Sequence, residues 1–143
     1  MTKEEWERKR RYYEGEVKKI AIPEWPTEAQ VKNLSSKIDT LYTEAIFDYG
    51  RAKVADDNTD RLIERQQRLN ASGSNDAERK RSGMVAVTEY RKRDGEVVDL
   101  LNVQETTNER LVFMDNVLKA LESKLKSLTL SYGTLKMESN LHR

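Results

Sequence analysis

The apolar residues in the last third of the chain follow an unbroken heptad pattern with alternating steps of three and four. They are Leu111, Met114, Leu118, Leu121, Leu125, Leu128, Tyr132 and Leu135, which we call the heptad seam. A stripe this narrow is typical of a coiled coil and not of the wider apolar face of a globular helix. We predict that this helix packs along rod-shaped partner helices, in its own chain or in copies of it.

Two earlier segments also have helical periodicity. Residues 2–20 place aromatic and aliphatic side chains on one face, and Pro23 and Pro26 end this helix at a hinge over 22–26. Thr27 and Gln30 have the spacing of a capping box, which predicts that a second helix begins there and runs over 27–69. We expect Trp25, between the two prolines, to pack at the hinge.

A polar segment over 70–75 is the clearest break in the chain, and it predicts a turn. Asn75 and Glu78 then have the spacing of a second helix start, which predicts a long third helix over 76–138. The turn makes the second and third helices antiparallel. The sequence therefore predicts a single all-α domain over residues 1–143, an elongated antiparallel helical hairpin or coiled coil with an additional N-terminal helix.

Two layouts of the N-terminal helix satisfy this pattern. In the first, the proline hinge bends the chain without reversing it, so the first helix continues the second and covers the overhang of the third. In the second, the first helix folds back as a third member of a bundle. The seam likewise closes within one chain or joins several. We favour a homo-oligomer, because a thin partner helix buries such a long stripe poorly in a monomer.

The composition suits a helical body with a thin core. Apolar and charged residues each make up 36% of the 143 residues, with two prolines, six glycines and no cysteine. This excludes a disulfide framework and a thiolate metal site. The N-terminal residues lack the apolar segment of a signal peptide, and no run of 18 apolar residues occurs. We expect no membrane partner and a cytoplasmic location, which is the host cytoplasm if a phage encodes the protein.

The net charge of +1 is unevenly distributed, since residues 61–93 carry nine basic and four acidic side chains. The nine, which we call the basic strip, are Arg61, Arg65, Arg68, Arg79, Lys80, Arg81, Arg91, Lys92 and Arg93. In the predicted hairpin the first six meet near its tip, and the last three follow about three turns along the third helix. A local excess of this kind is typical of contact with an anionic partner.

The basic strip has two interpretations. It contacts the phosphates of a single-stranded nucleic acid with little base readout, or it is the solvated, ion-paired surface of a coiled coil. Tyr90 either stacks on a base or belongs to the seam. The aromatic residues Trp6, Tyr12, Tyr13 and Trp25 likewise form a docking patch for a protein or, as we favour, cap the open end of the bundle.

Motifs for catalysis are absent from the sequence. The only histidine is His142, and we find neither a phosphate-binding glycine loop nor a nucleophile motif. Adjacent carboxylates such as Asp56 and Asp57 are more typical of a solvated helix face than of a metal site. We therefore predict a protein that is not an enzyme and needs no cofactor or metal.

The segments Asp76-Ala77-Glu78-Arg79-Lys80-Arg81-Ser82-Gly83-Met84 and Lys119-Ala120-Leu121-Glu122-Ser123-Lys124-Leu125-Lys126-Ser127 give the chain a pattern that resembles UvsY-type bacteriophage recombination mediators. The resemblance covers about half of the chain. It implies an all-helical, ring-forming protein that binds single-stranded DNA and helps to load a RecA-like recombinase. That family pairs Lys and Arg around an Ala in its basic motif, and Arg51-Ala52-Lys53 is the nearest match, in reversed order.

We therefore expect an oligomeric adaptor that binds single-stranded nucleic acid on the basic strip and bridges it to a protein partner, as a recombination mediator does. The alternative is a structural coiled-coil subunit or scaffold, in a virion or another complex, that binds no nucleic acid. The two differ in one respect: nucleic-acid binding needs a free basic strip, whereas the structural alternative needs a paired one.

Overall fold

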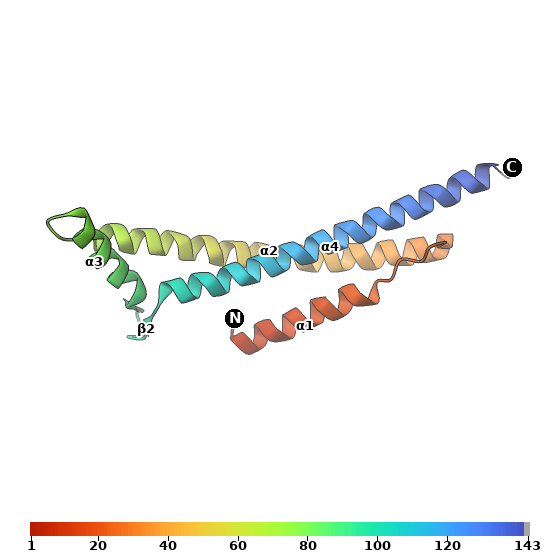
Figure 1. Ribbon diagram of the computed structural model, residues 1–143. Coiled ribbons are helices and arrows are strands. Elements are labelled where there is room, and N and C mark those ends of the chain that lie inside the picture. The colour runs from red at the N-terminus through yellow and green to blue at the C-terminus, as the bar shows by residue number, and fades with distance from the viewer. Residues whose placement is uncertain (142–143) are drawn as a thin grey trace. The chain divides into compact units, whose positions relative to one another are not determined.

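The computed structural model describes residues 1–141, without the side chains of Thr134, Leu135, Glu138, Ser139 and Asn140. Its elements are α1 (Lys3–Lys19), α2 (Glu28–Leu69), α3 (Asp76–Thr88), β1 (Tyr90–Arg91), β2 (Val97–Val98) and α4 (Leu100–Leu141). Helices contain most of the described residues, which confirms the predicted all-α class (Figure 1).

The chain divides into two compact units, and the long helices α2 and α4 contribute to both. Unit 1 comprises Met1–Asp48 and Met114–Arg143, and unit 2 comprises Tyr49–Phe113. The sequence led us to expect one helical domain over residues 1–143, whereas each unit has buried residues of its own.

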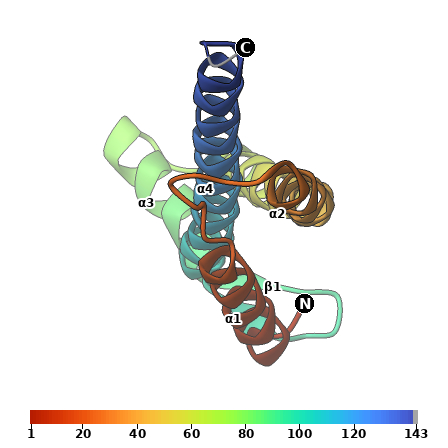
Figure 2. The ribbon, with the colours of Figure 1, turned by 90° about the vertical axis from the view of Figure 1, so that its right-hand side faces the viewer.

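In unit 1, α1 folds back along α2, which is the second of the two predicted layouts. Tyr12 Oη donates to Glu44, and Lys9 Nζ lies 2.6 Å from an oxygen of Asp48. The earlier residue of α1 thus contacts the later residue of α2, so the two helices are antiparallel. The linker between the two helices passes α4, where Lys124 Nζ donates to the Ile20 carbonyl oxygen at 2.6 Å (Figure 2). The first layout, with α1 continuing α2, is wrong.

The ends of these helices follow the sequence signals closely. Thr2 caps α1 in a full capping box with Glu5. Thr27 and Gln30 exchange the two hydrogen bonds that their spacing predicted. The expectation that Trp25 packs at the hinge is wrong, because Pro26 takes the buried position and Trp25 is 60% exposed.

The heptad seam is largely buried within this one chain. In unit 1, Met114, Leu121 and Leu128 are at most 1% exposed, and Leu118 is 8% exposed. Leu125 is 37% exposed, because the buried face is centred on the Met114–Leu128 row and leaves this flank uncovered within the chain. Of the remaining positions, Leu111 in unit 2 and Tyr132 in unit 1 are half-buried, and the side chain of Leu135 lies outside the described residues.

The aromatic residues of α1 differ in burial. Tyr13 is 1% exposed and packs edge-on against Tyr12, so it belongs to the core of unit 1. Its hydroxyl donates to Asp48, which also accepts from Lys9. Burial, together with this hydrogen bond, raises the pKa of Tyr13, and the hydrogen bond to Glu44 raises the pKa of Tyr12 to about 12.

Tyr13→Phe is expected to weaken unit 1 and to reduce its sensitivity to alkali. The folded state favours the neutral phenol, so this stabilisation is present below the unfolded pKa near 10 and is lost as the pH rises through the raised folded pKa. We expect a loss of about 1 kcal/mol at neutral pH from the missing hydrogen bond. Urea unfolding of both proteins across the alkaline range measures it.

Tyr49→Phe is the matched control for Tyr13→Phe, because the Tyr49 hydroxyl has no hydrogen-bond partner among the described residues. It should leave both the stability and the alkaline profile close to those of the parent. An unchanged alkaline profile in the Tyr13 variant would contradict the assignment of this hydroxyl to the interface between α1 and α2.

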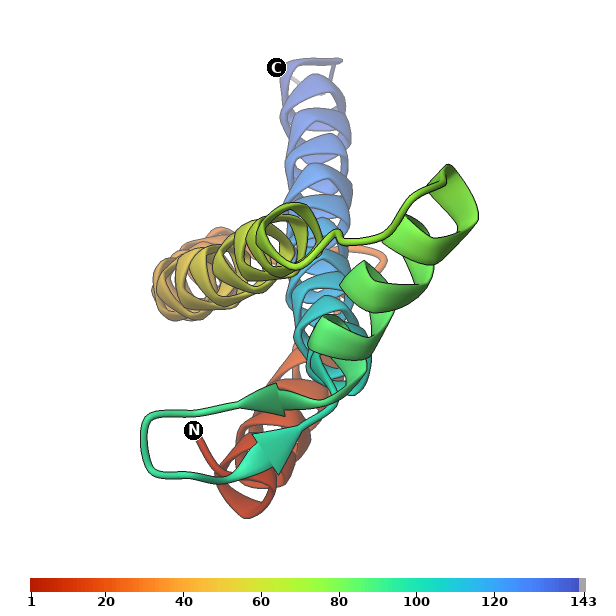
Figure 3. The ribbon, with the colours of Figure 1, turned by 90° about the vertical axis from the view of Figure 1, so that its left-hand side faces the viewer.

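In unit 2 the predicted long helix over 76–138 is wrong. α3 ends at Thr88, and a two-stranded antiparallel hairpin pairs Tyr90 with Val98 before α4 begins at Leu100 (Figure 3). The backbone N–H of Gly95 donates to the Lys92 carbonyl oxygen, and Gly95 has a φ of 89°. This is the three-residue hairpin loop in which a type I turn is followed by a left-handed glycine.

The core of unit 2 gathers residues from every element of the unit. Ile63 of α2, Val87 of α3 and Leu100 of α4 form the buried cluster. Tyr90 and Val98 pack against it from the two strands. The hairpin is therefore anchored to the helices through one face, which holds its loop in place.

Polar residues fix the antiparallel register of α2 and α4 in unit 2. Gln104 Nε2 donates to Asp60 at 2.6 Å, and Thr107 Oγ1 donates to Asp56 at 2.9 Å. Gln104 and Thr107 continue the three-and-four spacing N-terminal to Leu111, where polar groups typically set the register or the oligomeric state. The carboxylates of α2 are their partners. Asp56 is only 7% exposed, so a shift of one helix along the other would leave a buried carboxylate unpaired.

α3 approaches α2 closely at Gly83. The start of α3 is set by Asn75, whose side chain accepts from the Glu78 N–H, and Ser82 holds the preceding turn through the backbone of Ser72. A Cβ at Gly83 would lie 3.1 Å from the Gln67 carbonyl oxygen. This is tighter than an ordinary Cβ contact, so a side chain at this position would push the backbones of the two helices apart by a few tenths of an ångström.

Gly83→Ala is expected to lower the free energy of unfolding by about 1 kcal/mol, even though alanine is the better helix former. The added Cβ meets backbone atoms of α2, which cannot move aside as a flexible side chain can. Gly50→Ala in α2 is the control, since nothing lies within 4 Å of its added Cβ. It should raise stability by up to about 1 kcal/mol. If urea unfolding showed that Gly83→Ala and Gly50→Ala raise the free energy of unfolding equally, the close approach of α3 to α2 would be contradicted.

Candidate nucleic-acid interface

All nine residues of the basic strip are exposed and lie in unit 2. They come from three places: α2 carries Arg61, Arg65 and Arg68, α3 carries Arg79, Lys80 and Arg81, and the hairpin carries Arg91, Lys92 and Arg93. The i, i+4, i+7 spacing on α2 does place its three arginines on one helix face.

Few of these cations are engaged within the chain. Arg79 lies 3.8 Å from Asp76, and Lys92 lies 3.5 Å from Glu96, both on exposed surface. The other seven form no ion pair with any residue that the structure describes. Exposed pairs of this kind contribute at most about 1 kcal/mol, so an anionic ligand can displace them.

Arg68, Arg79 and Lys80 line one groove where α3 crosses α2. The groove has a volume of about 570 Å³ and is open to solvent. Its apolar part consists of Ala71, Gly83 and Met84, and Glu64 and Gln67 add polar groups from α2. The predicted meeting of the α2 and α3 cations at the hairpin tip is seen for these three, whereas Arg61, Arg65 and Arg81 do not line the groove.

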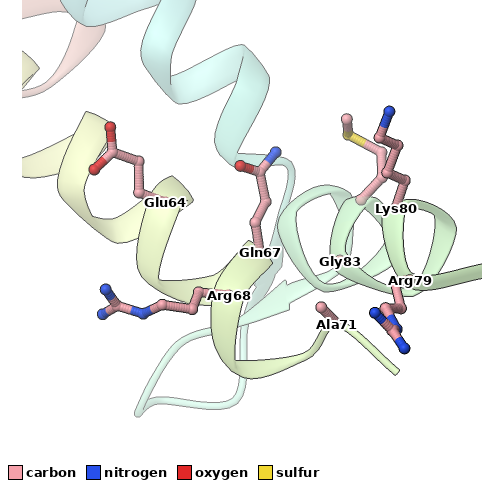
Figure 4. A pocket seen from close by; sticks show the side chains of 8 residues that line it. Glu64, Gln67, Arg68, Ala71, Arg79, Lys80 and Gly83 are labelled. Atoms are coloured by element: carbon pink, nitrogen blue, oxygen red, sulfur yellow. The ribbon is translucent and has the colours of Figure 1, made fainter. Parts of the chain in front are cut away.

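The charged ends around the groove do not converge on one point. In Figure 4, Arg68 extends away from α3, while Arg79 and Lys80 extend to opposite sides of that helix. A single small anion could not contact all three groups at once. This spread of charge fits a chain of anionic groups, such as successive phosphates.

Arg91, Lys92 and Arg93 do not continue a helical stripe, because the hairpin replaces the predicted helix. They occupy the end of β1 and the loop. A hydrogen bond from the Glu96 N–H to Asp94 and the Lys92–Glu96 backbone pair hold this loop. The three cations are therefore carried on a short, anchored projection of unit 2.

Tyr90 is half-buried against the core of unit 2. It does not belong to the seam, because it lies on β1 and not on α4. The seam interpretation of this tyrosine was therefore wrong, whereas its stacking on a base stays a prediction.

The carboxylates of Asp56, Asp57 and Asp60 lie within 4.8 Å of one another on α2. We expected Asp56 and Asp57 to lie on a solvated face, but Asp56 is buried. Thr107 and Gln104 donate to Asp56 and Asp60, and Lys53 donates to Asp57. Each carboxylate thus has a partner from this chain, and we assign no metal to the cluster.

The segment that matches the basic motif of the resembling family most closely is partly engaged. Lys53 is 2.9 Å from Asp57, one turn along α2. Its ammonium group is thus less available to a ligand than the unpaired cations of the basic strip. His142 lies outside the described residues.

Comparisons with protein-family models, with curated proteins and with solved structures give no match for this chain. No helix among the described residues combines the length and the apolar character needed to cross a membrane.

One signal for the hairpin was present in the sequence. Asp94-Gly95 is a turn dipeptide, and residues with high strand propensity flank it at Tyr90, Val97 and Val98. The helix predicted over 76–138 ran through this dipeptide. The groove between α2 and α3 had no comparable signal, because it depends on a crossing of two helices.

Proposed function

We propose that the protein is a non-enzymatic adaptor that binds single-stranded nucleic acid through the basic strip. The observation that carries this proposal is the exposure of all nine cations in unit 2, seven of them without an ion-pair partner in the described part of the chain. Cations arranged in this way can neutralise successive phosphates and release their counterions.

Single strands are favoured over duplex because of how the cations are distributed. They lie on two crossed helices and a hairpin, and their ends diverge around the groove. A flexible single strand can pass between cations that point in different directions, whereas a stiff duplex would have to bend to reach them. The resemblance to UvsY-type mediators supports the same ligand and extends the proposal to loading of a RecA-like recombinase.

Self-association is a second part of the proposal, but its contact surface is not the buried part of the heptad seam. The seam needs no second copy to cover Met114, Leu121 and Leu128, since unit 1 buries them. What remains for contact between copies is the exposed apolar side chains of α4, among them Met137 at 69% and Leu141 at 81%. Repeated copies of the basic strip would raise the avidity for a long strand.

The test is fluorescence anisotropy of a labelled deoxythymidine oligomer at low salt, beside the same oligomer in duplex form. We expect saturable binding of the single strand and weaker binding of the duplex. No binding of either would contradict the proposal and favour the structural alternative, a coiled-coil scaffold that binds no nucleic acid. Light-scattering mass of the same protein, with and without the oligomer, tests the self-association.

A further inference from the structure

The groove where α3 crosses α2 in unit 2 is lined by both apolar and cationic residues. Contact with phosphates alone would use only the cations. Ala71, Gly83 and Met84 give it an apolar floor, and Met84 keeps 43% of its surface exposed. Arg79 and Lys80 also line the groove, and in Figure 4 their side chains extend to opposite sides of α3. A ligand that fills the groove must therefore be anionic and also carry apolar surface.

We propose that this groove is a base-binding subsite, in which one unstacked nucleobase of a bound strand lies on the floor formed by Ala71, Gly83 and Met84. This inference rests on the proposed function. The volume of about 570 Å³ lies within the range of small-molecule sites and leaves room for a base with its sugar. The phosphates on either side of that base then reach the surrounding cations.

Glu64 and Gln67 supply groups for the edge of the base. Neither side chain has a hydrogen-bond partner among the described residues, and both line the groove. The Glu64 carboxylate accepts only, so it suits amino groups such as N4 of cytosine. The Gln67 amide both donates and accepts, and so complements either kind of edge group.

An acidic amphipathic helix is the other ligand that combines anionic and apolar groups. One feature of the groove disfavours it. The backbone N–H groups in the interior of a helix are already hydrogen-bonded, so none is free to donate to the Glu64 carboxylate. A base edge has free N–H groups. The groove therefore suits a nucleobase better than an acidic helix, and a peptide is included in the test as the competing ligand.

The experiment compares two single strands of equal length, a deoxycytidine oligomer and an abasic deoxyribose phosphate oligomer, by anisotropy at one salt concentration. The abasic strand has the phosphates but no bases, so phosphate contact alone predicts equal affinity. We expect the deoxycytidine oligomer to bind about fivefold tighter or more. Equal affinity of the two strands would overturn the base subsite and leave the proposed function intact.

Ala71→Trp fills the floor while every cation is kept, and Ala77→Trp is the matched control on an exposed position of α3 outside the groove. We expect Ala71→Trp to remove the preference for deoxycytidine and leave abasic binding unchanged, with Ala77→Trp keeping the preference. An equal preference in both variants would contradict the location of the subsite. Circular dichroism of both variants checks that the helices are intact.

Two further outcomes distinguish failure of the base subsite from failure of nucleic-acid binding as a whole. If neither oligomer binds at low salt, the proposed function fails and the subsite fails with it. If a labelled helical peptide of glutamate and leucine binds, loses its affinity in Ala71→Trp, and the two oligomers bind equally, the groove is a protein-docking site and not a base subsite.

Discussion

Replacing Arg65, Arg68 and Arg79 together by Glu is expected to weaken binding of a single-stranded oligomer about 100-fold at low salt. All three side chains are exposed in unit 2, and none is buried in its core. The variant should therefore keep its helix content while it loses affinity, because within the chain it removes only exposed contacts of Arg79 with Asp76 and with the Gly73 carbonyl oxygen. Anisotropy titration measures the affinity, and circular dichroism measures the helix content.

A matched control changes the net charge by the same amount in unit 1. Lys18, Lys32 and Lys126 are exposed and form no ion pair with a described residue. Their joint replacement by Glu should reduce the affinity much less, through long-range repulsion alone. Equal losses of affinity in the two variants would mean that binding depends on the net charge of the protein and not on the position of the basic strip.

Leu121→Ala is expected to lower the free energy of unfolding by about 3 kcal/mol, since it removes a fully buried side chain and leaves a cavity. Leu121 is 0% exposed in unit 1. Leu125→Ala, the same substitution one seam position later, should cost less than about 1 kcal/mol, because Leu125 is 37% exposed. Urea unfolding followed by circular dichroism measures both.

The outcome separates a seam closed within one chain from a seam that joins copies. Within one chain, the two leucines differ and the unfolding midpoint does not depend on protein concentration. If copies bury both residues, the two variants lose similar stability and the midpoint rises with concentration. The second pattern would contradict the burial described for unit 1.

Helix boundaries were predictable wherever a local signal sets them. Thr27, Asn75 and the prolines act on backbone groups within a few residues, so their effect does not depend on the rest of the fold. The structure places helix starts at Glu28 and Asp76, where those signals indicate them. The burial of Met114 and Leu121 was predictable for a different reason, since a heptad stripe must be covered by another helix.

Tertiary features were not predictable from periodicity. The return of α1 along α2 is held by contacts between residues more than thirty positions apart, such as Tyr12 with Glu44. The heptad pattern is equally compatible with a straight continuation. The break after Thr88 was missed because Val97, Val98 and Leu100 remain apolar on both sides of the hairpin, which conceals a change from helix to strand.

The candidate site was predictable in composition and only partly in geometry. The excess of basic residues over 61–93 identified the surface, and their exposure in unit 2 agrees with that reading. The apolar floor between α2 and α3 depends on Gly83 and on the crossing that it allows. No spacing along the sequence encodes that crossing, so the groove emerges only from the packed helices.

The salt dependence of single-strand binding tests the central claim most directly. A plot of the logarithm of the observed binding constant against the logarithm of salt concentration has a slope of about −0.7 for each phosphate neutralised. We predict a steep slope for the parent and a slope shallower by about 2 for the Arg65, Arg68 and Arg79 variant. A parent slope near zero, or equal slopes for the two proteins, would contradict phosphate binding by the basic strip.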